Sequence, residues 1–199
     1  MTKPLPEQPE FEPLTRTQLL IAMGVTAIVL LVVAKLWQHF GSVSLLPVKW
    51  KIEAFPQGLG IGLLITALSS LVYRLWPAYR QSADLYLEMV LKPLLLPDII
   101  WLGLLPGLSE ELLFRGVMLP ALGLDMPGLV FTSLCFGLLH LSGIEQWPYA
   151  VWASVVGFIL GYSVLTTGNL LVPIVAHVIT NLVSSYLWKL DSNNSGGKT

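Results

Sequence analysis

The 199-residue sequence has very little charge: only 12% of its residues are Asp, Glu, Lys or Arg, whereas 54% are hydrophobic. Soluble domains carry about one quarter charged residues, so this chain cannot cover a surface that faces water. The net charge of −1 also gives no electrostatic reason to expect binding to nucleic acid. The composition therefore predicts an integral membrane protein, with the lipid bilayer as a partner and no nucleic-acid partner.

Cysteine and histidine are equally scarce, with one cysteine and three histidines in the chain. The single Cys135 excludes an intramolecular disulfide framework and any zinc or iron–sulfur site built from several cysteines. Its apolar surroundings predict a small buried residue rather than a nucleophile. The sequence contains no Gly-x-Ser-x-Gly and no His-Glu-x-x-His, so serine-hydrolase and zincin signatures are both missing. Any catalytic chemistry must come from other polar groups.

Long apolar runs dominate the rest of the chain. A helix that crosses a bilayer needs about 20 apolar residues. We predict about six such spans, which fall near residues 17–37, 59–76, 94–122, 129–141, 148–165 and 170–188. The mixed segment 43–55 predicts a loop, and charges at helical spacing over 79–92 predict an amphipathic helix at the membrane surface. The predicted fold class is an all-α polytopic membrane protein with one interfacial helix.

The same pattern predicts how the chain is divided. The expected parts are an N-terminal tail (1–16), N-terminal spans with the amphipathic helix (17–93), a helical core (94–190) and a flexible tail (191–199). The acidic, proline-rich start is unlike a cleavable signal peptide, so we expect the first span to remain as an anchor. With six spans, seven Lys or Arg residues fall on the side of the termini and three on the other. Both termini are therefore predicted to be cytoplasmic.

One apolar run contains three charges within six residues, Glu110, Glu111 and Arg115. An ionisable group at bilayer depth costs about 3 kcal/mol or more unless it is paired or wetted, so the cluster is a candidate functional site. Glu111 and Arg115 are four residues apart and share a helix face, where they can form an ion pair. Glu110 lies about 100° around the helix. It is left as the carboxylate that can act as a general base or acid.

The backbone before this cluster contains two helix-breaking residues, Pro106 and Gly107. They predict a break or kink just before Ser109. Ser109 would then cap a new helix that starts with Glu110.

Three further polar residues lie at membrane depth on other runs, His140, His177 and Asn181. His177 and Asn181 are four residues apart, and both can donate hydrogen bonds to one point, as an oxyanion requires. In one mechanism, Glu110 and His140 deprotonate a water while His177 and Asn181 stabilise the tetrahedral intermediate. In the other, Glu110, His140 and His177 bind a zinc ion that activates the water. Each polar pair taken singly is also compatible with a purely structural role.

Together the motifs resemble those of the CPBP family, the type II CAAX-protease and bacteriocin-processing proteins, described as glutamic-type intramembrane proteases and formerly as metalloproteases. The matching motifs are Glu110-Glu111-x-x-x-Arg115, Phe136-x-x-x-His140 and His177-x-x-x-Asn181, in that order on separate helices. The resemblance covers about residues 94–190. The catalytic residues that it implies are Glu110, His140, His177 and Asn181, with Glu111, Arg115 and Phe136 in supporting positions.

The resemblance also implies a substrate and a location. The expected activity is hydrolysis of membrane-associated peptides or proteins, of CAAX or bacteriocin-leader type, in a bacterial inner membrane or an organellar membrane. No cofactor is preferred, because Asn181 would be an ordinary oxyanion donor and an unusual zinc ligand. Zinc held by Glu110, His140 and His177 is the alternative.

Two other functions compete with a protease. One is a proton-coupled transporter that uses Glu110 and the histidines as a relay, although the sequence has no inverted repeat. The other is a non-catalytic membrane immunity or partner protein that only binds. A protease requires His140 to lie within about 10 Å of Glu110.

Overall fold

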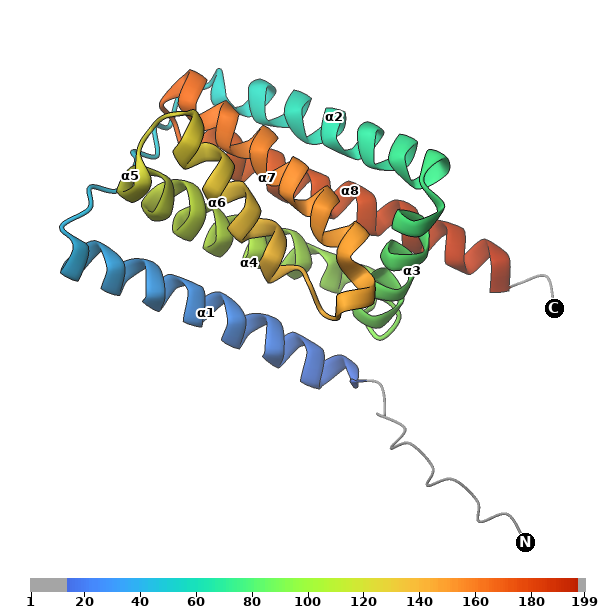
Figure 1. Cartoon of the computed structure of the whole chain (residues 1–199). Helices are drawn as coiled ribbons and strands as arrows, with labels where there is room; N and C mark the ends of the chain where they lie inside the picture. The colour runs from blue at the N-terminus through green and yellow to red at the C-terminus, as the bar shows by residue number, and fades with distance from the viewer. Residues whose placement is uncertain (1–13, 197–199) are drawn as a thin grey trace, which may run out of the picture.

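The structure, a computed structural model, describes the backbone of residues 14–196 and the side chains of residues 14–192. All regular secondary structure in this part of the chain is helical (Figure 1). The longer helices are α1 (Arg16–Gly41), α2 (Ala54–Leu75), α3 (Pro77–Leu91), α4 (Ile99–Glu111), α6 (Met126–Leu139), α7 (Trp147–Thr167) and α8 (Leu171–Gly196). The shorter elements are η1 (Leu96–Asp98), the π-helical η2 (Leu112–Met118), α5 (Leu119–Leu122) and η3 (Ile144–Gln146). The predicted all-α class is confirmed.

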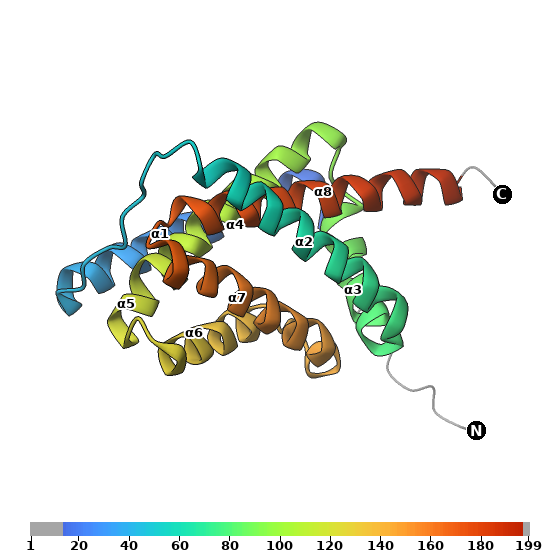
Figure 2. The same cartoon turned by 90° about the horizontal axis from the view of Figure 1, so that it is seen from above.

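Helix α8 lies at the centre of the bundle and packs against both α2 and α4 (Figures 1 and 2). Helices α6 and α7 form a second closely packed pair, which joins the rest through contacts of α7 with α8. Helix α3 lies across one end of the bundle, where it contacts α2, α7 and α8. Helix α1 packs on α4 and η2. Residues from α2, α3, α4, α6, α7 and α8 thus surround a common interior.

The number of helices that can cross a membrane is smaller than predicted. In the described chain four helical segments are long and apolar enough, Arg16–Gly41, Ala54–Leu75, Ile144–Thr167 and Leu171–Ser192. A fifth exists only if α3 and the helix Leu96–Leu122, which are bent by 104°, count as one span. Helix α6 has 14 residues, so it is about 21 Å long and shorter than the hydrocarbon core. The protein is a polytopic membrane protein with four or five candidate spans rather than about six.

The chain has no helix break before Ser109, and the predicted cap is wrong. Helix α4 continues through Pro106 and Ser109 to Glu111 and then widens into η2. The Ser109 hydroxyl does not cap a new helix but donates to the Leu105 carbonyl at 2.7 Å. A proline inside a helix removes one hydrogen bond, and neighbouring groups in a membrane protein can satisfy the freed carbonyl. The charged cluster therefore lies within one continuous helical segment.

The ends of the chain and the first connection differ in part from the prediction. Helix α8 continues to Gly196, so residues 191–196 are helical rather than a flexible tail; the expected tail residues 1–13 and 197–199 lie outside the described range. The predicted loop is confirmed for residues 43–53. Its extended part, residues 43–51, forms a strap. The Asn169 side chain holds the strap by accepting from Lys49 N at 2.8 Å and donating to Lys49 O at 2.9 Å.

Candidate active site

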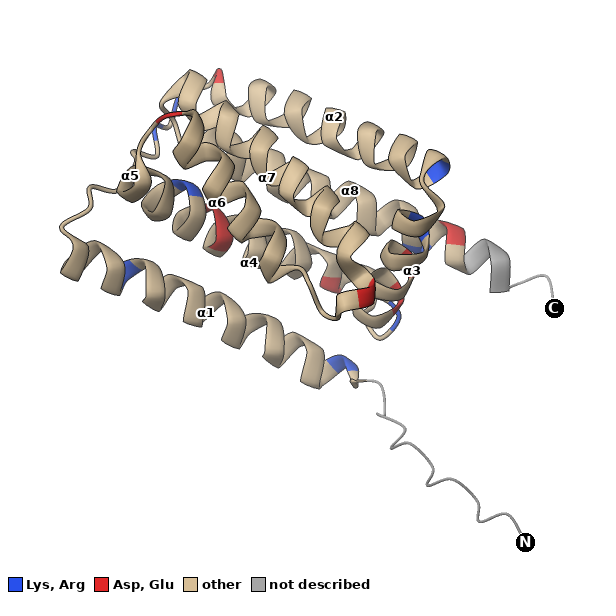
Figure 3. Cartoon of the chain, viewed as in Figure 1, with Lys and Arg blue, Asp and Glu red and all other residues tan. Residues whose placement is uncertain are grey.

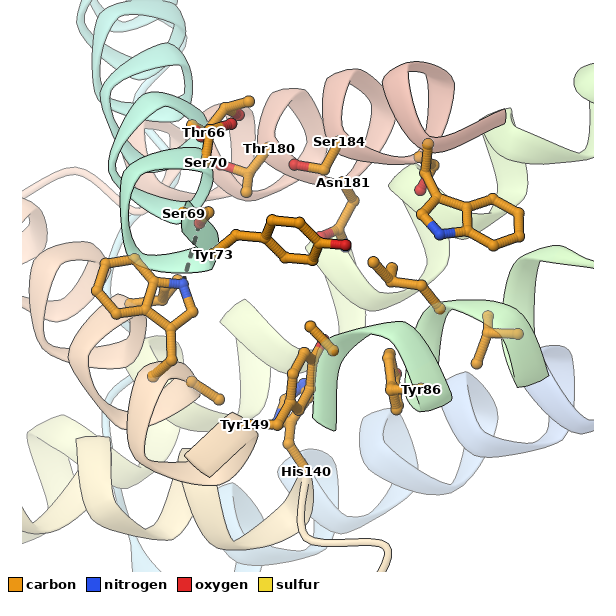
Figure 4. A pocket seen from close by; sticks show the side chains of 18 of the residues that line it. Thr66, Ser69, Ser70, Tyr73, Tyr86, His140, Tyr149, Thr180, Asn181 and Ser184 are labelled. Atoms are coloured by element: carbon orange, nitrogen blue, oxygen red, sulfur yellow. Dashed lines mark hydrogen bonds between the residues drawn. The ribbon is translucent and has the colours of Figure 1, made fainter. Parts of the chain in front are cut away.

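A cavity of about 550 Å³ lies inside the bundle, a volume typical of ligand pockets (Figure 4). All four residues predicted as catalytic, Glu110, His140, His177 and Asn181, line this one cavity. They come from α4, from the residue that ends α6, and from α8. The helix packing thus brings together three motifs that are far apart in the sequence.

Glu110 and His140 face each other across a short gap. His140 Nε2 is 3.9 Å from Glu110 Oε2, and the two side chains are 19% and 15% exposed. His140 Nδ1 lies 2.8 Å from the Phe136 carbonyl oxygen, which can only accept, so Nδ1 carries a proton. The other nitrogen of the neutral ring, Nε2, is therefore an acceptor. Two acceptors meet at this point, and Glu110 Oε2 has no hydrogen-bond partner among the described residues.

Glu111 connects two helices beside this pair. The predicted ion pair with Arg115 is confirmed at 2.8 Å, with both side chains buried. His177 Nδ1 donates to the same oxygen, Glu111 Oε1, also at 2.8 Å. Arg115 Nη2 donates in addition to the Gly157 carbonyl at 2.8 Å, which ties α7 to the cluster. Glu111 thereby fixes the orientation of the His177 ring on α8.

Phe136 packs in the centre of these polar groups. Its ring centroid lies 4.7 Å from that of His140 and 5.9 Å from that of His177. The Arg115 guanidinium carbon lies 4.4 Å from the same centroid, a cation–π distance. Phe136 is 2% exposed, so it separates the two imidazoles and holds them apart within a packed core.

Asn181 also interacts with α4. Its Nδ2 approaches the Leu102 carbonyl at 3.5 Å. Leu102 precedes Pro106 by four residues, and Pro106 has no N–H with which to occupy that carbonyl. The helix-breaking signal in the sequence therefore marks a contact of α4 with Asn181, instead of a helix boundary.

Two further walls of the cavity were not predicted as part of the site. Hydroxyl groups from α2 and α8 line one side, and aromatic rings from α3 and α7 lie on the other, with Tyr73 between them (Figure 4). The predicted amphipathic helix α3 is present, but its inner face covers the cavity, and Tyr79 is only 5% exposed. Charges at helical spacing reveal the outer face of such a helix, whereas nothing in the pattern indicates what its inner face covers.

The zinc alternative requires Glu110, His140 and His177 to surround one point. Within residues 14–192, no three His, Cys, Asp or Glu side chains are arranged so that they could hold a metal ion. The side chains of the described residues therefore do not form the expected zinc ligand set.

Comparison with known proteins finds a related family over the part of the chain that contributes these residues. The model of a family described as "Type II CAAX prenyl endopeptidase Rce1-like" matches residues 92–183, a range that includes all four cavity residues named above. Just under half of the chain is thus similar to the Rce1-like family. The resemblance drawn from the three motifs is thereby confirmed, and the Rce1-like part of the chain extends from the end of α3 into α8.

Two relatives come from Bacillus subtilis (strain 168). The chain is 29% identical to the uncharacterized protein YpbD over 126 residues, which are 63% of this chain and 64% of YpbD. It is 34% identical to the uncharacterized protein YyaK over 82 residues, 37% of this chain and 27% of YyaK. The matches thus span less than two thirds of either relative. No solved structure matches the chain.

Proposed function

We propose that this Rce1-like protein is an intramembrane endopeptidase whose substrates are membrane-associated peptides or proteins with CAAX-type or bacteriocin-leader-like segments. The proposal is carried by the 3.9 Å approach of Glu110 to His140 inside a cavity large enough for a peptide segment. The match of residues 92–183 to the Rce1-like family supports the same class of activity.

In this proposal Glu110 and His140 activate the attacking water. Glu110 Oε2 and His140 Nε2 both accept, so one water can donate a hydrogen bond to each. Glu110 takes a proton while the water oxygen attacks the scissile carbonyl carbon, which becomes tetrahedral. The carboxyl group then returns the proton to the leaving nitrogen, and the C–N bond breaks. No step requires a metal ion.

Asn181 and His177 stabilise the oxyanion on the other side of the scissile carbonyl. Asn181 can donate from its amide nitrogen. His177 can donate from Nε2 only when the ring carries two protons, because its Nδ1 proton is already directed at Glu111. In this proposal the two α8 side chains serve the intermediate, and the contribution of His177 depends on its protonation.

Membranes of cells that express wild type or Glu110→Ala test the proposal by comparative proteomics. We expect one or more membrane proteins to accumulate uncut with Glu110→Ala. Purified wild-type protein should cleave synthetic peptides that span the cleavage sites of these accumulated proteins. The Glu110→Gln variant should cleave the same peptides about 10²–10⁴-fold more slowly. Glu88→Gln is the matched control, because this carboxylate is 55% exposed and paired with Lys92.

Two results would go against the proposal. Identical membrane proteomes for wild type and Glu110→Ala would favour a non-catalytic partner protein. Inhibition of the purified enzyme by a chelator, with recovery on addition of zinc, would contradict the metal-free mechanism, for which we expect unchanged activity.

A further inference from the structure

The two hydrogen-bonding side chains that α8 brings to the cavity, His177 and Asn181, already contact other protein groups. His177 uses Nδ1–H on Glu111 Oε1 at 2.8 Å, which leaves an acceptor Nε2 on the neutral ring. A second proton would add a cation close to Arg115, whose side chain is only 2% exposed. Asn181 Nδ2 already approaches the Leu102 carbonyl at 3.5 Å. One N–H of Asn181 remains for an oxyanion formed in this cavity, and a further neutral donor would stabilise that oxyanion without depending on protonation.

Two tyrosines in the aromatic wall carry donors of this kind. Tyr86 on α3 and Tyr149 on α7, both labelled in Figure 4, stack with ring centroids 4.5 Å apart. Both line the same cavity as Glu110. Neither phenol oxygen has a protein hydrogen bond in the part of the chain that the structure describes. Both side chains are partly buried, and their hydroxyls are available to a molecule in the cavity.

Tyr149 is the better placed of the two for catalysis. Its ring centroid lies 6.3 Å from that of His140, and Figure 4 shows the two side chains next to each other. Tyr79 stacks on Tyr149 at 6.2 Å with an interplanar angle of 3°, in addition to the stack with Tyr86. Two rings from α3 thus hold one ring of α7 in place. A donor fixed in this way requires no reorganisation when charge develops.

We infer that Tyr149 is a further catalytic residue, whose phenolic O–H donates a hydrogen bond to the oxyanion of the scissile carbonyl, and that Tyr86 is its positioning residue. The inference rests on the proposed protease function. The phenol keeps its proton throughout: the hydrogen bond strengthens as the carbonyl oxygen becomes negative and weakens again when the C=O bond re-forms. Helix α3 contributes to catalysis through its stacked rings.

The test uses full-length purified enzyme and synthetic peptides that span the cleavage sites left uncut in Glu110→Ala membranes. Tyr149→Phe removes only the hydroxyl and keeps the stack, so we expect kcat to fall about 10²-fold while KM stays within about threefold. Tyr86→Leu loses the stack and should lower kcat, and Tyr86→Phe, which restores the aromatic ring, should recover kcat relative to Tyr86→Leu. Tyr162→Phe is the matched control on the same helix, since Tyr162 stacks on Phe158 at 6.3 Å.

The outcomes separate this inference from the function on which it rests. Wild-type kcat for Tyr149→Phe, together with an inactive Glu110→Gln, overturns the role of Tyr149 alone. A fully active Glu110→Gln overturns both. An equal loss of kcat in Tyr149→Phe and Tyr162→Phe, accompanied by a lower unfolding temperature, marks the effect as structural and also overturns the inference.

Discussion

Two ion pairs in this chain have the same helical spacing and differ only in burial. Glu111 and Arg115 are 2.8 Å apart and 0% and 2% exposed. Glu88 and Lys92 are 2.7 Å apart and 55% and 72% exposed. Removing one partner of a buried pair leaves an uncompensated charge in a medium that cannot solvate it, whereas water replaces the partner at the surface. The four-residue spacing is compatible with both ion pairs, but burial decides which of them contributes to the stability of the fold.

Arg115→Met should lower the free energy of unfolding by about 3–5 kcal/mol, because Glu111 would keep its charge without its cation. Lys92→Met should change it by less than about 1 kcal/mol. Unfolding of the detergent-solubilised protein, followed by circular dichroism, measures both. The double variant Glu111→Gln/Arg115→Met should recover part of the loss, since no charge is left buried. Equal changes in the free energy of unfolding for Arg115→Met and Lys92→Met would contradict the role of burial.

The sequence predicts contacts within one helix much better than contacts between helices. The Glu111–Arg115 pair and the grouping of His177 with Asn181 follow from a separation of four residues. The bond from His177 to Glu111 joins α8 to α4, and the stack of Tyr86 on Tyr149 joins α3 to α7. No periodicity encodes such contacts, because they depend on how the helices cross. Glu110 and His140 were paired because both are polar at membrane depth, and the resemblance to a family supported the pairing; helix spacing alone could not.

At the scale of the helices, the close approach of α2 to α8 forms one wall of the cavity. A Cβ atom added at Gly62 would lie 2.7 Å from the Ala176 backbone oxygen and 2.9 Å from Ile179 Cβ. The backbone oxygen cannot move aside without shifting α8. Small residues at helix contacts are the usual means of close packing in membranes, where apolar burial gives little driving force. The position of Thr66 and Ser69 in the cavity wall depends on this contact.

Gly62→Ala should therefore destabilise the protein by about 1–3 kcal/mol through overpacking, and lower peptide cleavage by displacing α2. Gly60→Ala is a matched control on the same helix, since a Cβ there meets nothing within 4 Å among the described residues. This control should be neutral or slightly stabilising, because alanine favours helix. Thermal unfolding in detergent compares the two. Similar midpoints for both variants would show that α2 and α8 are not closely packed at Gly62.

The helices themselves were predicted with uneven success for physical reasons. Long apolar runs identify α1, α2, α7 and α8, because a lipid-facing helix is apolar on most sides. The run that contains α6 is apolar as well, but hydropathy does not limit its length, which is set by Asp125 at its start and by His140 at its end. The start of α2 at Ala54 and the course of the strap were missed, since they depend on Asn169 and not on local composition.

Considered as a whole, the molecule has both described ends on one side. Arg16, at the start of α1, donates to Asp98 at 2.7 Å, and Lys189, near the end of α8, donates to the Leu94 carbonyl at 2.7 Å. Both contacts involve the segment 94–98, so the ends are close together whatever the number of spans. The strap lies at the other end of the bundle (Figure 1). Figure 3 shows Lys and Arg residues near both ends of the bundle. From their positions in the helices, the basic residues of the terminal side are Arg16, Arg74, Arg80, Lys92 and Lys189, against Lys35, Lys49 and Lys51 on the strap side.

Because basic residues are more numerous on the terminal side, cytoplasmic termini remain the prediction. Two exposed glutamines test it in a Cys135→Ala background: Gln57 at the strap end of α2, and Gln81 on α3 at the terminal side. In intact cells, a membrane-impermeant maleimide should label Gln57→Cys, whereas Gln81→Cys should react only after permeabilisation. The reverse pattern would show that the protein has the opposite orientation in the membrane. Labelling of both cysteines without permeabilisation would mean that α2 does not cross the membrane.

The same labelling decides from which side the cavity is reached. Arg74, at the end of α2, and Asp191, near the end of α8, are exposed and line the cavity, so its mouth is on the terminal side. If Gln81→Cys is protected as expected, a bulky maleimide at Arg74→Cys should also require permeabilisation, and its attachment should block peptide cleavage by closing the mouth. Labelling at Leu71→Cys, on an exposed position one turn earlier, should leave cleavage intact. Equal inhibition at both positions would contradict an entrance at Arg74 for cytoplasmic substrates.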